Sequence, residues 1–193
     1  MAWTAHRVVL RLCSPMHIGL GKVGNLQRTR PFVTGRNLWG ALTARMTRDA
    51  HPGGKPSPQA YAEMGRRVHA DLTFSYFYPT IRGDGAVELW PWQDGFRWRF
   101  LSTYASTALD YAFTSAEEAS LHEVECLVPH ARWAGPGRGR PGAAEPEAAP
   151  PVYLVGTVFE REGSRLDWRA ALRRLQIGGE RGYGWGRGWP VGD

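Results

Sequence analysis

Short stretches of alternating hydrophobic and polar positions predict several β-strands. In residues 6–12, Val8, Leu10 and Leu12 fall on one face, and this period of two is typical of a half-buried strand. A Gln-Asp-Gly sequence at residues 93–95 indicates a hairpin turn between two later strands. The other stretches rich in β-branched and aromatic residues are 72–80, 86–92, 96–101, 121–128, 152–161 and 183–191.

Apolar positions spaced three and four residues apart predict two helices. The first spans residues 34–50, where Thr34 or Asn37 can cap the start, and the second follows Asp167, which we expect to cap it. A short helix is also expected around residues 61–68. The apolar positions are Leu38, Ala41, Leu42 and Met46 in the first helix, and Trp168, Ala171, Leu172 and Leu175 in the second.

The order of these elements predicts an α+β protein. With an insertion at roughly residues 80–150 set aside, the order is strand, helix, strand, strand, helix, strand, as in the βαββαβ core of ferredoxin-like and RRM-like folds. The insertion lies between the second and third core strands and contains the predicted hairpin. It ends in the low-complexity residues 134–151, where we expect a mobile surface loop. Residues 17–30, which hold three glycines and no acid, are expected to form a loop as well.

Charge is distributed unevenly along the chain. Its net charge of +6 comes from 24 cationic and 18 acidic residues, and 22 of the cationic residues are arginine. Residues 1–48 contain no acid and carry +8, residues 49–160 carry −5, and residues 161–193 carry +3. If the two basic ends meet in the fold, they form one positive face suited to a polyanion. Arginine suits phosphate binding, although a GC-rich genome would produce the same bias, and composition leaves both explanations open.

The last segment, residues 176–193, is a glycine-rich loop that we call the tail. Its larger side chains are Arg181, Tyr183, Trp185 and Arg187. A helix C-cap would explain Gly178 and Gly179 but not the glycines that follow. From residue 181 to 187 glycines alternate with the larger side chains, and an extended segment would place the glycines on one face, where RNA or the first helix could approach. Exposed backbone N–H groups bind phosphates and aromatic planes stack on unpaired bases, so the tail favours single-stranded RNA over an inert loop.

Motifs for several other chemistries are missing from the sequence. The glycines follow a helix instead of preceding one, which excludes the dinucleotide fingerprint, and no GxxxxGK[ST] run occurs. The two cysteines, Cys13 and Cys126, belong to no metal-ligand cluster, and we expect two buried thiols in a reducing cytoplasm instead of a disulfide. No run of eighteen apolar residues is present, and residues 1–13 are typical of a first strand instead of a signal peptide. We therefore expect a cytoplasmic protein without cofactor, metal or membrane contact.

Three stretches, in order along the chain, resemble the RAMP superfamily of CRISPR-associated proteins. They are 14-SPMHIGLG-21, 31-PFVTGRNLWGALTARM-46 and 177-IGGERGYGWGRG-188. Met16 stands where these proteins usually have leucine, and Arg36-Asn37 where they have Ser-Ser. A fourth stretch, residues 107–127, is similar to a segment of the subunits that cap the 5′ end of the guide RNA in type III-like effector complexes.

The resemblance implies a single RAMP domain over residues 1–193, with CRISPR RNA as ligand and backbone RAMP subunits as partners in antiviral defence. Target RNA and a separate nuclease subunit are further partners that it allows. The tail would then pack against the guide RNA near the first helix. The residues expected to bind RNA are His17, Lys22, Asn25, Arg28, Arg30, Arg36, Asn37, Arg45, Gly179, Arg181, Tyr183, Gly184, Trp185 and Arg187.

No catalytic residue is expected. RAMP subunits that cut target RNA carry an aspartate in the loop after the first strand, and residues 19–30 contain no acid. The alternative is a metal-independent endoribonuclease that processes CRISPR repeat RNA with His17 as general base, since histidine titrates near neutral pH. A third interpretation is a protein scaffold whose basic face is merely solvated.

Overall fold

The computed structural model describes the chain in three parts, residues 2–118, 120–132 and 149–192. The predicted mobile loop spans residues 134–151, and its residues 134–148 lie outside these parts. Within them, no helix is both long enough and apolar enough to cross a membrane.

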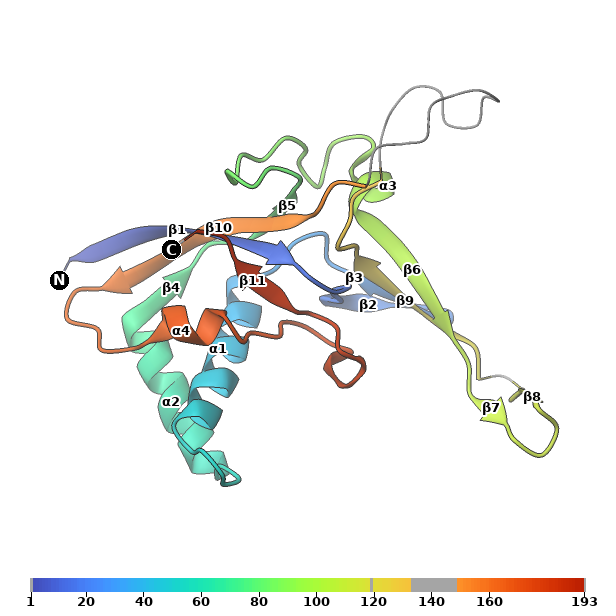
Figure 1. Cartoon of the computed structure of the whole chain (residues 1–193), viewed down its shortest axis with the longest axis horizontal. Coiled ribbons are helices and arrows are strands. Elements are labelled where there is room, and N and C mark those ends of the chain that lie inside the picture. The colour runs from blue at the N-terminus through green and yellow to red at the C-terminus, as the bar shows by residue number, and fades with distance from the viewer. Residues whose placement is uncertain (1, 119, 133–148, 193) are drawn as a thin grey trace.

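An antiparallel sheet forms the centre of the molecule (Figure 1). The strand β1 (Trp3–Leu12) pairs along its length with β10 (Tyr153–Arg161). On the other side of β1 lies β11 (Gly188–Pro190), and the free side of β10 pairs with β4 (Leu72–Phe74) and β5 (Tyr78–Thr80). The expected strand over residues 72–80 is thus broken into two short strands. The strands of this sheet lie in the order β11-β1-β10-β4. The predicted α+β, ferredoxin-like core is confirmed.

Three helices cover one face of this sheet (Figure 1). The helix α1 (Gly35–Asp49) begins after Thr34, whose side chain accepts a hydrogen bond from the Asn37 N–H, as a helix N-cap does. The helix α2 (Pro58–Asp71) is longer than the short helix expected there, because Ser57 caps it and proline suits its first position. The helix α4 (Trp168–Leu172) is capped by Asp167 as predicted.

The core lies between the sheet and these helices. Leu10, Leu12 and Leu154 of the sheet belong to one core cluster with Leu42 and Trp168 of the helices, and all five residues are almost fully buried. The alternating face of the first strand is therefore the face that the helices cover, as its pattern of two predicts.

The insertion begins differently from the predicted hairpin. Residues 86–92 form no strand, and residues 96–100 form the helix α3 (Phe96–Phe100). The aromatic residues at 96, 98 and 100 imitate a strand, but Phe96 and Phe100 are buried while Trp98 is exposed. A strand would turn all three to one face, whereas a helix separates the middle residue from the other two.

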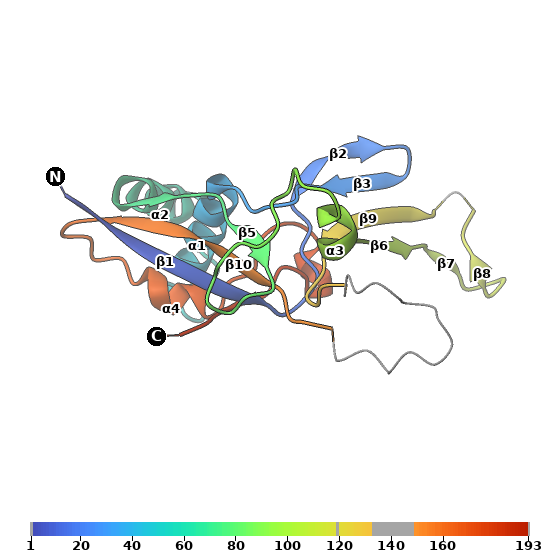
Figure 2. The same ribbon diagram turned by 90° about the horizontal axis from the view of Figure 1, so that it is seen from above.

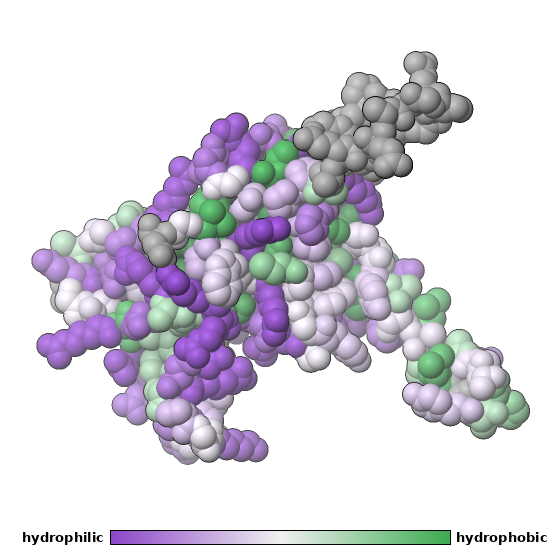
Figure 3. All heavy atoms as spheres, viewed as in Figure 1, coloured by the Kyte–Doolittle hydropathy of each residue, from purple (hydrophilic) through white to green (hydrophobic). Residues whose placement is uncertain are grey.

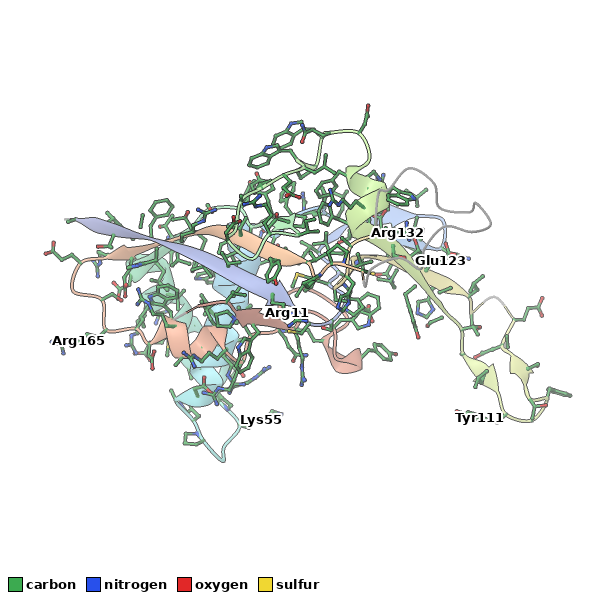
Figure 4. All side chains as sticks on the ribbon, turned by 45° about the horizontal axis from the view of Figure 1, so that its top comes forward. Arg11, Lys55, Tyr111, Glu123, Arg132 and Arg165 are labelled. Atoms are coloured by element: carbon green, nitrogen blue, oxygen red, sulfur yellow. The ribbon has the colours of Figure 1, made fainter. Side chains whose placement is uncertain are left out.

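After α3, the described part of the insertion contains a pair of strands. The strand β6 (Leu101–Ser106) pairs antiparallel with β9 (His122–Leu127), close to the predicted strand at 121–128. Between them, β7 (Leu109–Asp110) and β8 (Ser115–Ala116) form a hairpin that projects from the body of the molecule (Figures 1 and 2). The exposed Tyr111 lies at its far end (Figure 4), and apolar side chains are exposed there as well (Figure 3).

The predicted loop at residues 17–30 is also different in the structure. It forms a second hairpin, β2 (Gly19–Val23) and β3 (Leu26–Thr29), and β3 pairs parallel with β9 of the insertion. The four strands make a second sheet in the order β2-β3-β9-β6. The strand β9, with which β3 pairs, lies about a hundred residues later in the sequence. Residues 17–30 taken alone do not show this pairing, and their glycines therefore indicated a loop.

Candidate nucleic-acid interface

The tail is fixed at both ends to the turn that follows β1. The Gly179 N–H donates a hydrogen bond to the His17 carbonyl at 2.9 Å, and the Gly186 N–H donates to the Pro15 carbonyl at 2.7 Å. A Cβ atom on Gly178, whose φ is +90°, would collide with the same His17 carbonyl. Glycine is therefore required here because two backbones touch.

His17 connects this contact to the second sheet. Its side chain is only 7% exposed. Its Nδ1 lies 2.7 Å from the Glu125 carbonyl oxygen, which can only accept, so Nδ1 carries the proton and donates. The Glu125 carboxylate is buried as well, where it accepts the Thr29 N–H at 3.0 Å and pairs with Arg97. His17 thus holds the tail, the turn after β1 and β9 together.

The middle of the tail is a tight turn, not an extended segment. Residues Arg181–Tyr183 form one turn of 3-10 helix, after Glu180 with φ +55° and before Gly184 with φ +84°. The predicted alternation of a glycine face and a side-chain face is therefore wrong. Nothing lies within 4 Å of a Cβ atom built at Gly182 or Gly184, so this turn faces open space. It lies between α1 on one side and β6 and β9 on the other (Figures 1 and 2).

On the α1 side of this turn lies a cavity of about 280 Å³, which we call the basic groove. Its lining residues are Ala41, Ala44, Arg45, Arg48, Arg174, Gln176, Arg181 and Gly182. Four of these are arginines, and they come from both basic ends of the sequence.

One acid balances part of this charge. Asp49 accepts the Arg45 Nε–H at 3.0 Å and pairs with Arg174 at 3.1 Å, so both guanidinium groups are held in place. Among the described residues, the guanidinium groups of Arg48 and Arg181 have no ion pair or hydrogen bond, and both residues are exposed. Two free guanidinium groups at one groove favour the binding of an anion such as phosphate.

On the other side of the turn lies a cavity of about 290 Å³, which we call the aromatic pocket. Its lining residues are Tyr104, Ser106, His122, Val124, Glu180, Tyr183 and Trp185. Trp185 is 8% exposed and Tyr183 is 84% exposed, so the predicted aromatic residues of the tail form an inner and an outer part of one pocket.

Four predicted residues lie outside both cavities, in the second sheet and the segment after it. Lys22 and Asn25 are exposed on the β2–β3 hairpin, and Arg28 is partly buried on β3. Arg30 follows β3, and its N–H donates to the Ile18 carbonyl at 2.6 Å. These residues extend the positive charge of the N-terminal part over the second sheet, away from the tail turn.

The other predicted residues have separate environments. Arg36 lines a cavity of about 520 Å³ with Trp39 and Tyr76, between α1 and β4. The Asn37 Oδ1 accepts the Thr34 hydroxyl at 2.6 Å and so belongs to the start of α1. Arg187 is exposed beside β11.

Most lining residues of the two cavities were absent from the expected set, among them Arg48, Arg174, Tyr104 and Glu180. Arg48 lies three residues after Arg45 on α1, and this helical spacing could have identified it. Arg174 lies just before the tail. Tyr104 and Glu180 gave no signal, because one lies in the insertion and the other is a single acid in a basic segment.

The described residues form no candidate metal site and no reactive buried thiol. No group of three or more His, Cys, Asp or Glu could hold a metal ion there. Both cysteines are free, but only Cys126 is buried; the expected burial of Cys13 is wrong, because that residue is exposed. Burial, followed by the nearby Glu125 charge, raises the pKa of the Cys126 thiol to about 11. This thiol is therefore neutral at physiological pH and a poor nucleophile.

Comparison with known proteins shows likeness in fold without likeness in sequence. No protein-family model matches the chain, and no curated protein matches it. Among solved structures, the fold is similar to a chain of the "Cryo-EM structure of the Type III-B Cmr-beta bound to cognate target RNA". The TM-score is 0.53 at 9% identity, over 97% of this chain and 96% of that chain. The protein thus shares an α+β fold, along nearly its whole length, with a chain of that RNA-bound structure.

Proposed function

We propose that the protein is a non-catalytic RNA-binding subunit of a CRISPR effector complex, which caps the 5′ handle of the CRISPR RNA and contacts adjacent backbone RAMP subunits. The basic groove is the observation that carries the proposal, because it joins arginines from the two basic ends of the chain at the glycine-rich tail. The likeness in fold to a chain of an RNA-bound Type III-B Cmr-beta structure supports it, as do the three sequence stretches that resemble RAMP proteins.

Phosphate binding in the groove follows from its charges. Asp49 orients Arg45 and Arg174, and the unpaired Arg48 and Arg181 are free to form two-pronged hydrogen bonds with phosphate oxygens. Each phosphate contact on a single strand releases counterions, so that log K falls with log salt by about 0.7 for each contact. Binding through this groove should therefore weaken steeply as salt is raised.

The absence of catalysis is part of the proposal and rests on His17. A general base has to reach within about 2.6–3.2 Å of the proton that it removes. His17 is only 7% exposed and is enclosed by the tail and by β9, which leaves little room for an RNA hydroxyl beside its ring. Its surroundings suit a residue that holds the fold together.

The first experiment measures RNA binding by the full-length protein against salt concentration, with a CRISPR repeat RNA as the probe. In the Arg48→Ala/Arg181→Ala variant, two phosphate contacts are lost, so the salt slope should fall by about 1.4. The matched control is Arg66→Ala/Arg67→Ala, which removes the same charge from exposed positions on α2. An equal change in both variants would mean that only overall charge matters, and the groove would not be the binding site.

The second experiment incubates the same repeat RNA with the wild-type protein, with and without divalent metal. We expect intact RNA. A discrete product that disappears in His17→Asn, where the asparagine side-chain N–H can still donate to the Glu125 carbonyl, would instead establish the endoribonuclease alternative.

The capping role is tested by recovery of the protein from cells that express the CRISPR RNA. We expect one small RNA with a defined 5′ end together with RAMP subunits. Recovery of heterogeneous RNA fragments would contradict the capping role and leave general RNA binding.

A further inference from the structure

We propose that the aromatic pocket holds one unpaired guanine base of the bound RNA, and that the Glu180 carboxylate recognises it. This inference rests on the proposed function, because it takes RNA as the ligand. It adds a base-specific site to a protein whose basic groove reads only phosphates.

The pocket is built from two parts of the chain that lie far apart in the sequence. The strands β6 and β9 supply Tyr104 and Val124, and the tail supplies Glu180, Tyr183 and Trp185. Its volume of about 290 Å³ lies just below the usual range of small-molecule sites, about 300–1,000 Å³, and so suits one planar base and not a larger ligand.

The aromatic side chains suit a base that enters between them. The Trp185 ring is buried, and the Tyr104 ring meets it edge-on with centroids 5.8 Å apart and an interplanar angle of 84°. This contact fixes the inner wall of the pocket. The exposed Tyr183 ring stands at the solvent side, where it is free to stack on a bound base.

Two polar side chains of the pocket, Ser106 and His122, already have partners within the protein. The His122 Nδ1 lies 3.2 Å from the Ser120 carbonyl oxygen, so this nitrogen carries the proton and donates. The His122 Nε2 is then the acceptor of the Ser106 hydroxyl at 3.0 Å. Both ring nitrogens of His122 therefore have partners within the protein.

Glu180 is the one carboxylate of the pocket, and no partner of its side chain is found among the described residues. Its backbone has a φ of +55°, which is unusual for a residue other than glycine and is often found at functional sites. The Glu180 carbonyl accepts the Tyr183 N–H at 3.0 Å and the Trp185 N–H at 3.4 Å, so the turn holds this conformation. The Glu180 carboxylate has no partner in the described part of the chain, its backbone is strained, and it lies in the tail that we propose binds RNA. These features together favour a ligand that donates hydrogen bonds.

Guanine is the base that fits such an acid. Its N1–H and N2–H donors lie side by side, and a carboxylate can accept both at once. Adenine and cytosine each offer one exocyclic amine next to a ring-nitrogen acceptor that repels a carboxylate. Uracil offers one N–H between two carbonyl groups, so it is disfavoured for the same reason.

The two cavities also lie on opposite sides of the same turn, as the phosphate and the base of one nucleotide would require. Arg181 and Gly182 line the basic groove, and their neighbours Glu180 and Tyr183 line the aromatic pocket. A nucleotide that crosses the 3-10 turn can place its phosphate in the groove and its base in the pocket.

The test uses ten-nucleotide oligoadenylates with either no substitution, one central guanosine, or one central inosine, which keeps N1–H but lacks the N2 amine. Binding to the full-length protein is measured by fluorescence anisotropy. We expect the guanosine oligomer to bind about tenfold more tightly than oligoadenylate, as a two-pronged contact to a base provides, with inosine in between. Equal binding of all three would overturn the guanine site, and a retained salt slope would leave the proposed RNA binding intact.

Variants then assign the preference to Glu180. Glu180→Gln should abolish the preference for guanosine while overall affinity is kept or increased, because a negative charge is lost. The control Glu162→Gln makes the same charge change at an exposed position after β10 and should keep the preference. A preference that survives in Glu180→Gln would disprove the assignment.

Two further variants separate this site from the groove. Tyr183→Ala, at a highly exposed position that folding does not need, should weaken the guanosine oligomer more than oligoadenylate. Arg48→Ala/Arg181→Ala should weaken every oligomer by a similar factor. Loss of salt-dependent binding to all oligomers in the wild type would instead refute the proposed function itself.

Discussion

The two ends of the tail and its middle turn use glycine for different reasons. At the ends, Gly178 and Gly186 lie so close to carbonyl groups of the protein's own backbone that any Cβ atom would collide with them. In the middle turn, Gly182 and Gly184 face open space. The ends of this glycine-rich loop are thus part of the folded core of the protein, whereas its middle is open to solvent and is the part that we propose contacts RNA.

The side chains of the tail divide in the same way. Ile177, at the start, is fully buried in the core, whereas Arg181 and Tyr183 on the middle turn are exposed. Substitution of the end glycines should therefore cost the most stability, whereas substitution of the exposed side chains of the middle turn, Arg181 and Tyr183, should change RNA binding. Each of the following predictions tests one side of this comparison.

The largest loss of stability is expected for Gly186→Ala. The new methyl group would collide with the Ile177 carbonyl, and the residue has a φ of +79°. Steric overlap and an unfavourable φ together should destabilise the protein by about 3 kcal/mol. Thermal unfolding measures the loss, and Gly182→Ala is the matched control, since its φ is not positive and no atom lies within 4 Å. Equal midpoints for the two variants would contradict the division of the tail.

A smaller loss of about 2 kcal/mol is expected for His17→Ala, which leaves the buried Glu125 carbonyl without its donor. In His17→Asn, a side-chain N–H can replace Nδ1–H, so much of the loss should be recovered. Urea unfolding of both variants measures the difference. If alanine and asparagine are equally destabilising, the hydrogen bond is not what His17 contributes.

The core of the fold could be predicted from the sequence because its signals are local. The first strand, α1 and the cap at Asp167 follow from periodicity and capping residues within a few positions. The strand β9 was expected at residues 121–128, but its sheet could not be predicted, because β3 pairs with β9 and the pairing depends on buried contacts such as Thr29 with Glu125. Its strands are short and rich in glycine or polar residues.

The candidate site was partly predictable for the same reason. The charge of the two ends indicated a shared surface, and Arg45 and Arg181 do line one groove. Lys22 and Asn25 belong to the same acid-free segment, but the β2–β3 hairpin carries them elsewhere. Tyr104 joins Trp185 only through the tertiary fold, so no pattern in the sequence placed it in the pocket.

The smallest loss of stability is expected for Gly184→Ala, and this variant decides what the glycines of the middle turn do. An extended tail would have placed Gly184 against RNA, with a larger loss in affinity than in stability. In the turn, its φ of +84° is unfavourable for alanine, yet the space around it is open. We therefore expect a loss of stability of about 1 kcal/mol, with RNA affinity preserved after correction for the unfolded fraction. Thermal unfolding and anisotropy on the same preparation measure both quantities. A normal midpoint together with weakened binding would mean that RNA approaches the backbone at Gly184, and the comparison between fixed ends and an open turn would then extend to close backbone contact with the ligand.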